Sequence, residues 1–129
     1  MPRAASSRPT DAELDLLSVL WRRGPSTVRE VFEELSQTKP SGYTTVLKFL
    51  QIMADKGLVR RKEVHRVHLY EAATPQETTQ SELVRDLAAR AFGGSPLQLA
   101  MRALAAEQAS SEELAEIRRL LDGYEKGGK

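Results

Sequence analysis

The side chains in this sequence best suited to binding chemistry are short hydroxyl groups and one long cation. Thr44, Thr45 and Lys48 fall in the N-terminal half of a helix predicted over residues 43–56, on the side away from its apolar positions, with Gln51 further along. Hydroxyl groups can bond base edges or phosphates, and a lysine reaches guanine acceptors, so this face suits the major groove of DNA. Equally, such residues are found on ordinary solvated helix faces.

Cations gather in the segment that follows. Residues 39–66 contain seven Lys and Arg against two Asp and Glu, a local charge of +5 in a chain whose net charge is only +1. Most lie in a predicted hairpin, where they either place a wing beside the duplex or protect a strand edge from pairing. Arg66, at the predicted turn, is the preferred contact; the others considered are Arg60, Arg61, Lys62 and His65.

Other kinds of chemistry lack a residue set. The chain has no cysteine, which excludes a disulfide scaffold and a thiolate metal site. His65 and His68 are the only histidines, and two ligands are too few for a zinc site, so we expect no metal and no cofactor. The nucleophile elbow, the phosphate loop and the His-Glu metal motif are all missing, so we do not expect an enzyme.

The elements that carry these residues follow from capping signals and apolar spacing. Thr10 with Glu13 and Thr27 with Glu30 are capping boxes, and each opens an amphipathic helix. Gly24-Pro25 ends the first helix, residues 39–42 form a short turn, and a hairpin over residues 58–72 follows the third helix. This order predicts a mainly α protein with a small β-hairpin, a winged helix-turn-helix. Ser26 and Thr27, where the second helix begins, either cap it or contact phosphate.

The sequence predicts three regions. Residues 1–9 form a flexible basic tail, residues 10–73 a winged-helix DNA-binding domain, and residues 74–129 a helical dimerisation domain. The net charge is +3 over residues 1–73 and −2 over residues 74–129. A 56-residue unit buries only about 60% of its unfolded surface, so its apolar stripes need a partner, either the winged helix or a second copy. We favour a homodimer, with contacts at Leu83, Leu87, Ala91, Leu114, Ile117, Leu121 and Tyr124.

Neither a signal peptide nor a membrane span is expected. The start of the chain lacks an apolar stretch, and nowhere do 18 apolar residues run together. We therefore expect a cytoplasmic protein with no membrane partner.

Three segments carry a family resemblance: TDAELDLLSVLWRRGPSTVREVFEEL, GYTTVLKFLQIMADKGLVRR and AFGGS. They resemble the penicillinase-repressor (BlaI/MecI) family of bacterial winged-helix repressors, and the resemblance extends from Thr10 to Leu121. It implies a homodimeric transcriptional repressor on a palindromic DNA operator, controlling beta-lactam-resistance-type or other stress genes. It also places Tyr43 on the recognition helix. The expected DNA-binding residues are Ser26, Thr27, Ser41, Tyr43, Thr44, Thr45, Lys48, Lys62, His65 and Arg66.

At three points the chain departs from the family. A membrane sensor protease cuts penicillinase repressors at an Asn-Phe bond in the fifth helix, and Arg102-Ala103 stands there in this chain. Copper-responsive relatives use C-terminal cysteines, which this chain lacks. His65 replaces the glycine that relatives usually carry in the wing, and histidine tolerates a positive φ better than most side chains. A protein-interaction module is the competing function, because a winged helix can present the same surface to a protein.

Overall fold

The computed structural model describes residues 8–127 of the 129-residue chain. Most of the predicted basic tail, residues 1–9, lies outside the described residues. Contacts divide the chain into two compact units, Met1–Leu83 and Val84–Lys129. The predicted domain boundary after residue 73 falls inside the first unit, directly after the hairpin.

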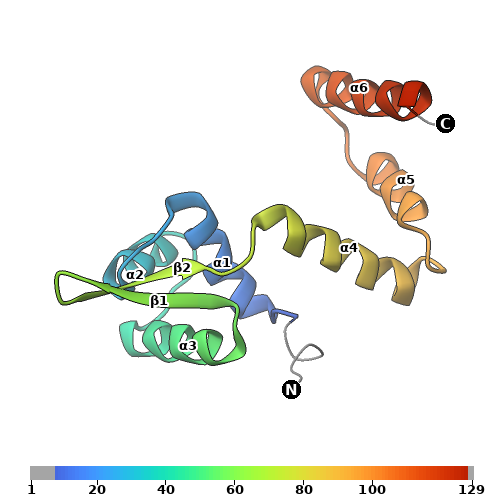
Figure 1. Ribbon diagram of the computed structural model, residues 1–129. Helices are drawn as coiled ribbons and strands as arrows, with labels where there is room; N and C mark the ends of the chain where they lie inside the picture. The colour runs from blue at the N-terminus through green and yellow to red at the C-terminus, as the bar shows by residue number, and fades with distance from the viewer. Residues whose placement is uncertain (1–7, 128–129) are drawn as a thin grey trace. The chain divides into compact units, whose positions relative to one another are not determined.

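The first unit contains three helices and a hairpin in the expected order (Figure 1). They are α1 (Asp11–Arg23), α2 (Val28–Ser36), α3 (Tyr43–Lys56), β1 (Val59–Val64) and β2 (Val67–Ala72). Both capping boxes form, with Thr10 accepting from the Glu13 N–H and Thr27 from the Glu30 N–H. The predicted winged helix-turn-helix and the mainly α fold class are confirmed.

Apolar side chains from all five elements meet in one core. Leu17, Val31, Leu50 and Tyr70 are each at most 2% exposed, although they come from four different elements. Within each helix the apolar residues recur every three or four positions, so one face of the helix is apolar and is buried. The core therefore fixes the positions of α3 and the hairpin relative to α1 and α2.

The hairpin is antiparallel and joined to the loop between α1 and α2. Val64 pairs with Val67, which leaves His65 and Arg66 as a two-residue turn. At the other end, Ser26 and Tyr70 exchange two backbone hydrogen bonds of 2.9 and 2.8 Å. The wing is thus attached to the segment that leads into α2, and in Figure 1 its turn extends beyond the helices.

The second unit consists of helices with little buried surface. It takes in the C-terminal part of α4 (Gln76–Ala91), followed by α5 (Pro96–Ala106) and α6 (Ser111–Gly127). None of the α5 residues is buried, and the only buried apolar residue in the unit is Ala88 among those that the structure describes. Within residues 8–127, no helix is long and apolar enough to cross a membrane.

Candidate nucleic-acid interface

Helix α3 has one buried face and one exposed face. Val46, Leu50 and Met53 are at most 1% exposed and pack into the core. Thr44 and Lys48 are exposed and lie one turn apart, so together with Gln51 they form a polar stripe on the outside. This stripe could bond base edges in a major groove.

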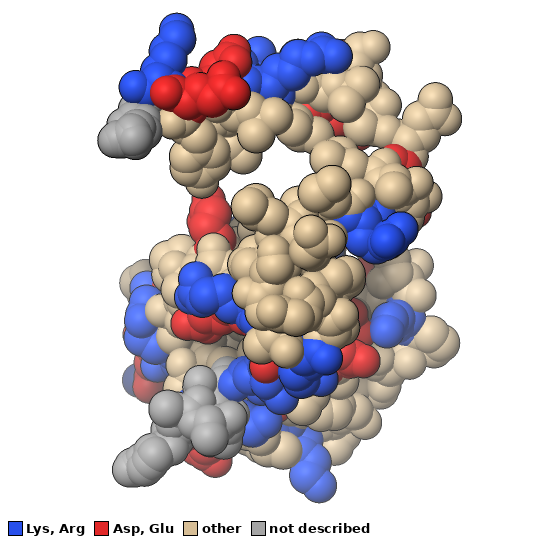
Figure 2. Space-filling view, turned by 90° about the vertical axis from the view of Figure 1, so that its right-hand side faces the viewer, with Lys and Arg blue, Asp and Glu red and all other residues tan. Residues whose placement is uncertain are grey.

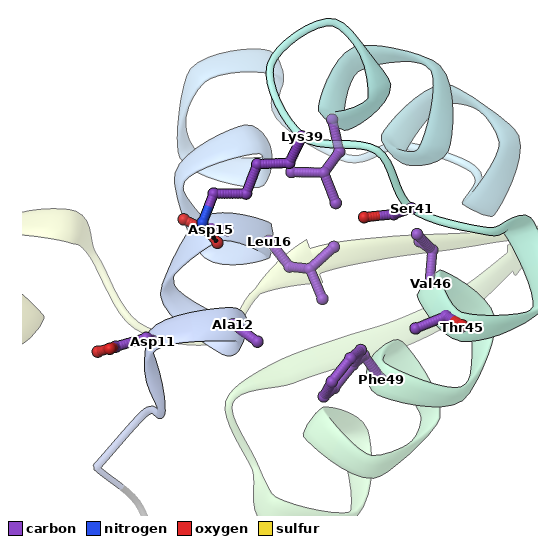
Figure 3. A pocket seen from close by; sticks show the side chains of 10 residues that line it. Asp11, Ala12, Asp15, Leu16, Lys39, Ser41, Thr45, Val46 and Phe49 are labelled. Carbon is purple, nitrogen blue, oxygen red and sulfur yellow. Dashed lines mark ion pairs between the residues drawn. The ribbon is translucent and has the colours of Figure 1, made fainter.

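Two other predicted contacts lie beside a cavity rather than on that stripe. Ser41, in the turn before α3, and Thr45, in its first turn, help to line a cavity of about 330 Å³ between α1 and α3 (Figure 3). An ion pair of 2.9 Å between Lys39 and Asp15 lies at this cavity and ties the turn to α1. Its hydrogen bond with Asp15 raises the pKa of Lys39. Thr44 and Thr45 therefore face different surroundings despite being neighbours in the sequence.

A buried carboxylate joins the far end of α3 to the start of α1. Glu13 is 2% exposed, and it accepts a hydrogen bond of 2.8 Å from the Lys56 ammonium and one of 3.0 Å from the Thr10 N–H. Burial alone would raise the pKa of Glu13, but the bonds from Lys56 and Thr10 outweigh it, and the net pKa is lowered. The pair helps to hold α3 in position.

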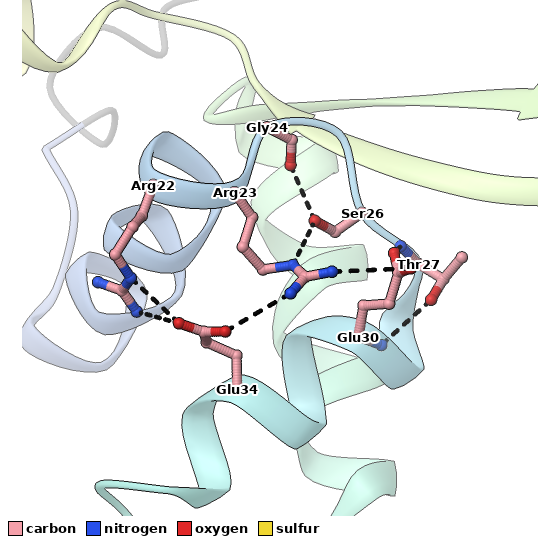
Figure 4. A network of polar contacts seen from close by, with 7 residues as sticks. All are labelled: Arg22, Arg23, Gly24, Ser26, Thr27, Glu30 and Glu34. Atoms are coloured by element: carbon pink, nitrogen blue, oxygen red, sulfur yellow. Dashed lines mark hydrogen bonds and ion pairs between the residues drawn. The ribbon is translucent and has the colours of Figure 1, made fainter.

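Ser26 and Thr27, the two predicted phosphate contacts at the N-terminus of α2, differ in their burial and hydrogen bonds. Thr27 is half-buried and its hydroxyl caps α2. Ser26 is fully buried: its hydroxyl donates to the Gly24 carbonyl at 2.8 Å and accepts from Arg23 Nε at 3.3 Å (Figure 4). Since its backbone is also bonded to Tyr70, Ser26 joins the loop to the wing and offers no group to a phosphate in this conformation.

Two arginines at the end of α1 are engaged with carboxylates of α2. Arg22 lies 3.0 Å from Glu34, and Arg23 lies 3.5 Å from Glu34 and 3.7 Å from Glu30 (Figure 4). These contacts hold α1 and α2 together at the loop that carries Ser26. The charges of Arg22 and Arg23 are therefore largely compensated within the fold.

The wing has both compensated and unpaired cations. Arg60 and Lys62 each lie 3.4 Å from Glu71 on the opposite strand. At the turn, His65 and Arg66 have φ angles of 51° and 67°, both in the left-handed region. A two-residue hairpin turn of this kind needs a positive φ at both positions, and here two residues other than glycine adopt it.

The structure therefore resolves the basic segment into two groups. Of its seven cations, Lys39, Lys56, Arg60 and Lys62 form ion pairs. Lys48, Arg61 and Arg66 have no ion-pair partner within residues 8–127, and all three are exposed. On the face that Figure 2 presents, Lys and Arg are interspersed with Asp and Glu rather than gathered in one basic surface. The sequence could not distinguish these groups, because the partners lie up to 43 residues away.

One candidate contact is absent from the sequence prediction. Arg29, on α2, lies over the ring of Tyr43 at the start of α3, with the guanidinium carbon 5.2 Å from the ring centroid. Phe32 supports the same ring edge-on at 5.7 Å. Arg29 also lies 3.9 Å from Glu33, yet its side chain remains 64% exposed. Tyr43 thus serves as a platform that holds a cation beside the N-terminus of α3, a placement that depends on tertiary contact alone.

The predicted dimerisation residues are mostly exposed. Leu87 is 45% exposed, Leu121 55% and Tyr124 72%, and Leu114 and Ala91 are also exposed, while Leu83 and Ile117 are half-buried. Sequence reasoning missed a comparable stripe on α5, formed by Leu97, Met101 and Leu104, which are 47 to 75% exposed. Its spacing of three and four residues could have revealed it.

The fold and this surface define a winged helix-turn-helix protein with a helical C-terminal unit. In the part of the chain that the structure describes, no group of three or more His, Cys, Asp or Glu side chains could hold a metal ion.

The sequence profile described as "Penicillinase repressor" matches residues 9–123, and the chain belongs to this family. The family consists of transcriptional repressors, not enzymes. Over 125 residues the chain is 33% identical to the transcriptional regulator BlaI of Mycobacterium tuberculosis, covering 96% of this chain and 90% of that protein. It is 24% identical over 115 residues to the penicillinase repressor of Bacillus licheniformis, covering 89% and 90% of the two chains.

A solved structure is also similar. It is the solution structure of the Bacillus licheniformis BlaI monomer in complex with the blaP half-operator, with 28% identity and a TM-score of 0.49. The match covers 54% of this chain and 84% of that one.

Proposed function

We propose that this protein is a homodimeric transcriptional repressor that binds a palindromic DNA operator sequence-specifically. The observation that carries the proposal is the exposed stripe of Thr44, Lys48 and Gln51 on α3, beside a wing whose turn carries Arg66, an arginine with no ion-pair partner in the described part of the chain. Membership of the penicillinase repressor family supports it.

In this proposal α3 lies in the major groove. Lys48 donates to guanine O6 and N7, and the Thr44 methyl or hydroxyl contacts the neighbouring base. Thr45 lies nearer to α1 and contacts the backbone at the edge of the groove, as does Ser41. Sequence discrimination therefore depends mainly on Lys48 and its neighbours on the stripe.

The phosphate contacts come from three places around α3. The free N–H groups at the start of α2, next to Thr27, suit a phosphate because the helix dipole is positive there. Arg29 adds a cation beside them, and Tyr43 holds it in place. Arg66 and His65 contact the adjacent backbone from the wing, with Lys62 further back along β1. Because Ser26 is buried, we leave it out of the contact set.

The second unit supplies the dimer contacts in this proposal. Among the residues whose burial the structure describes, its helices α5 and α6 contain no buried apolar residue, while Leu97, Leu120 and Tyr124 are more than 60% exposed. Exposed apolar surface on this scale is costly in water, and a second copy would cover it. Two copies would also double the phosphate contacts.

The proposal extends to the controlled genes and to the route of induction. We propose control of beta-lactam-resistance-type or other stress genes. A sensor protease is the family's route of induction, but Arg102-Ala103 in place of Asn-Phe argues against cleavage by a protease of the same specificity. The corresponding bond, Arg102-Ala103, lies inside α5, so a protease would have to unwind that helix before cleaving it.

Footprinting on genomic fragments tests the proposal. We expect protection of a palindrome whose half-sites lie about one or two helical turns apart, roughly 10 bp per turn. Protection without a preferred site would contradict specific repression. Weak association that is insensitive to salt would instead favour a protein-interaction module.

Light scattering on the full chain tests the dimer. We expect twice the chain mass of 14.4 kDa at micromolar concentration. A monomer at that concentration would contradict the dimer. The measurement needs no DNA, so it is independent of the operator.

A further inference from the structure

The segment between β2 and α4 is attached to the winged helix at several points. The Ala73 N–H donates to the Leu58 carbonyl at 2.9 Å, and Arg60 Nη1 donates to the Ala73 carbonyl at 3.4 Å. From α1, the indole N–H of Trp21 donates to the Thr74 carbonyl at 2.9 Å. Contacts from α1, from β1 and from the connection before β1 thus hold two consecutive residues, and the segment does not behave as a free linker.

The next residues leave little torsional freedom between this attachment and α4. Pro75 has a fixed φ and restricts Thr74 to extended conformations. The Pro75 carbonyl accepts hydrogen bonds from the Thr78 and Thr79 N–H groups, and Thr79 is 6% exposed, so the first turn of α4 is already set. Fixing the Thr74 carbonyl therefore fixes where α4 begins and in which direction it leaves β2.

Trp21 is well suited to this task. An indole can donate through its single N–H but cannot accept, so a half-buried tryptophan needs a carbonyl partner. Trp21 is only partly buried and packs against the edge of the core, rather than filling its centre. Its hydrogen bond spans 53 positions of sequence and joins α1 to this segment.

We propose that Trp21 is a positioning residue that fixes the exit of α4 and thereby restricts the half-site separation that the dimer accepts on DNA. This inference rests on the proposed function, a dimer on a palindromic operator. When two winged helices are rigidly connected, the second one has a high effective concentration at a half-site at one separation and a low effective concentration at half-sites at other separations. A loose connection makes these effective concentrations more equal. Trp21 would thus set specificity without contacting DNA.

Two variants weaken the attachment, and two reference variants calibrate the result. Trp21→Phe keeps an aromatic ring and removes the N–H, and Arg60→Gln removes the guanidinium contact with Ala73. Arg61→Gln, at the next position of β1, removes an exposed arginine that makes no ion pair within the described chain. Inserting two glycines after Thr74 leaves these contacts in place and uncouples α4 from them. If Trp21→Phe fails to fold, Arg60→Gln still tests the inference.

The first measurement needs no DNA. Trp21 is the only tryptophan, so the 15N-labelled full chain has a single indole N–H resonance. We expect its exchange with solvent to be at least about tenfold slower than that of a free indole. The glycine insertion lies beyond Thr74 and should keep this protection, because the contacts of Ala73 and Thr74 stay in place. Exchange at the free rate in the wild-type chain would overturn the inference while leaving DNA binding unaffected.

The second measurement compares operators that differ only in half-site separation. We expect Trp21→Phe and Arg60→Gln to reduce the preference for the native separation by about fivefold, with Arg61→Gln keeping the wild-type preference. Single half-site affinity should stay within about twofold for Trp21→Phe. An unchanged preference for the native separation in both variants would overturn the inference. An equal loss of affinity for the single half-site and for the full operator would also overturn it, because such a loss indicates general destabilisation. If the wild-type chain itself does not prefer the palindrome to a half-site, the dimeric operator proposal fails instead.

Discussion

Lys48 and Arg66 are both exposed and form no ion pair within residues 8–127, but they would occupy different positions relative to a bound duplex. Lys48 lies on the outer stripe of α3, whereas Arg66 lies in the turn of the wing. A contact to a base edge specifies sequence, and a contact to a phosphate adds affinity that depends on salt. The two residues should therefore respond differently to the same substitution.

Lys48→Ala should change the base preference at one operator position, with a cost of about 1–3 kcal/mol on the preferred base, because a donor pair to guanine is lost.

Arg66→Ala should weaken binding to all sequences equally and reduce the magnitude of the salt slope by about 0.9. Fluorescence anisotropy titrations at several salt concentrations measure both. Identical salt slopes for wild type and Arg66→Ala would refute the phosphate contact.

Arg29→Ala should lower affinity for every duplex and reduce the magnitude of the salt slope by about 0.9, because the cation beside α3 is lost. Arg22→Ala is the matched control, since it removes a similarly exposed arginine that is engaged with Glu34. The same titrations apply. An equal loss of affinity in both variants would indicate a general charge effect and exclude a specific contact by Arg29.

His65→Gly should raise the free energy of unfolding by about 1 kcal/mol, because glycine adopts the φ of 51° without a steric penalty. Urea denaturation measures the change. His68→Gly, on the adjacent strand, is the control and should be destabilising, since glycine weakens strands. A lower stability for His65→Gly would show that the histidine side chain contributes more to the wing than its backbone strain costs.

At the scale of elements, local patterns were sufficient to predict the first unit. The capping boxes at Thr10 and Thr27 and the apolar spacing in α3 depend on residues within four positions of each other, so the sequence displays them directly. Contacts between elements were not predictable in this way. The Glu13–Lys56 pair and the Arg29–Tyr43 contact depend on how helices pack, and the burial of Ser26 depends on β2.

Glu13→Gln should destabilise the fold by about 1–3 kcal/mol at pH 7, because it removes a charge-assisted hydrogen bond between α1 and α3. The pKa of Glu13 in the folded protein is lowered from its ordinary value of 4.5. The carboxylate therefore stabilises the fold at pH values above 4.5, and this contribution is lost as the pH falls through the folded-state pKa.

Urea denaturation at pH 7 and pH 3 measures this pH dependence. The difference in stability between wild type and Glu13→Gln should be smaller at pH 3. Glu33→Gln, at an exposed position on α2, serves as the control and should show little change at either pH. A difference that does not depend on pH would contradict the role of the Glu13 charge.

At the scale of the whole molecule, the sequence predicted two regions of opposite net charge and, in the C-terminal region, apolar stripes that need a partner surface to cover them. The exposed residues of α5 and α6 agree with that expectation, although what covers them is a property of the assembly and cannot be deduced from the folded chain alone. The operator sequence is also beyond prediction, because the rotamers of Lys48 and Thr44 at a base edge depend on the DNA.

The central claim is that α3 and the wing recognise a specific DNA sequence. The most direct test compares the affinity of the full chain for its footprinted palindrome with that for a scrambled duplex of equal length and composition, at one fixed physiological salt concentration. We predict a ratio of about 10³ or more in favour of the palindrome. Equal affinity for the two duplexes would contradict the claim.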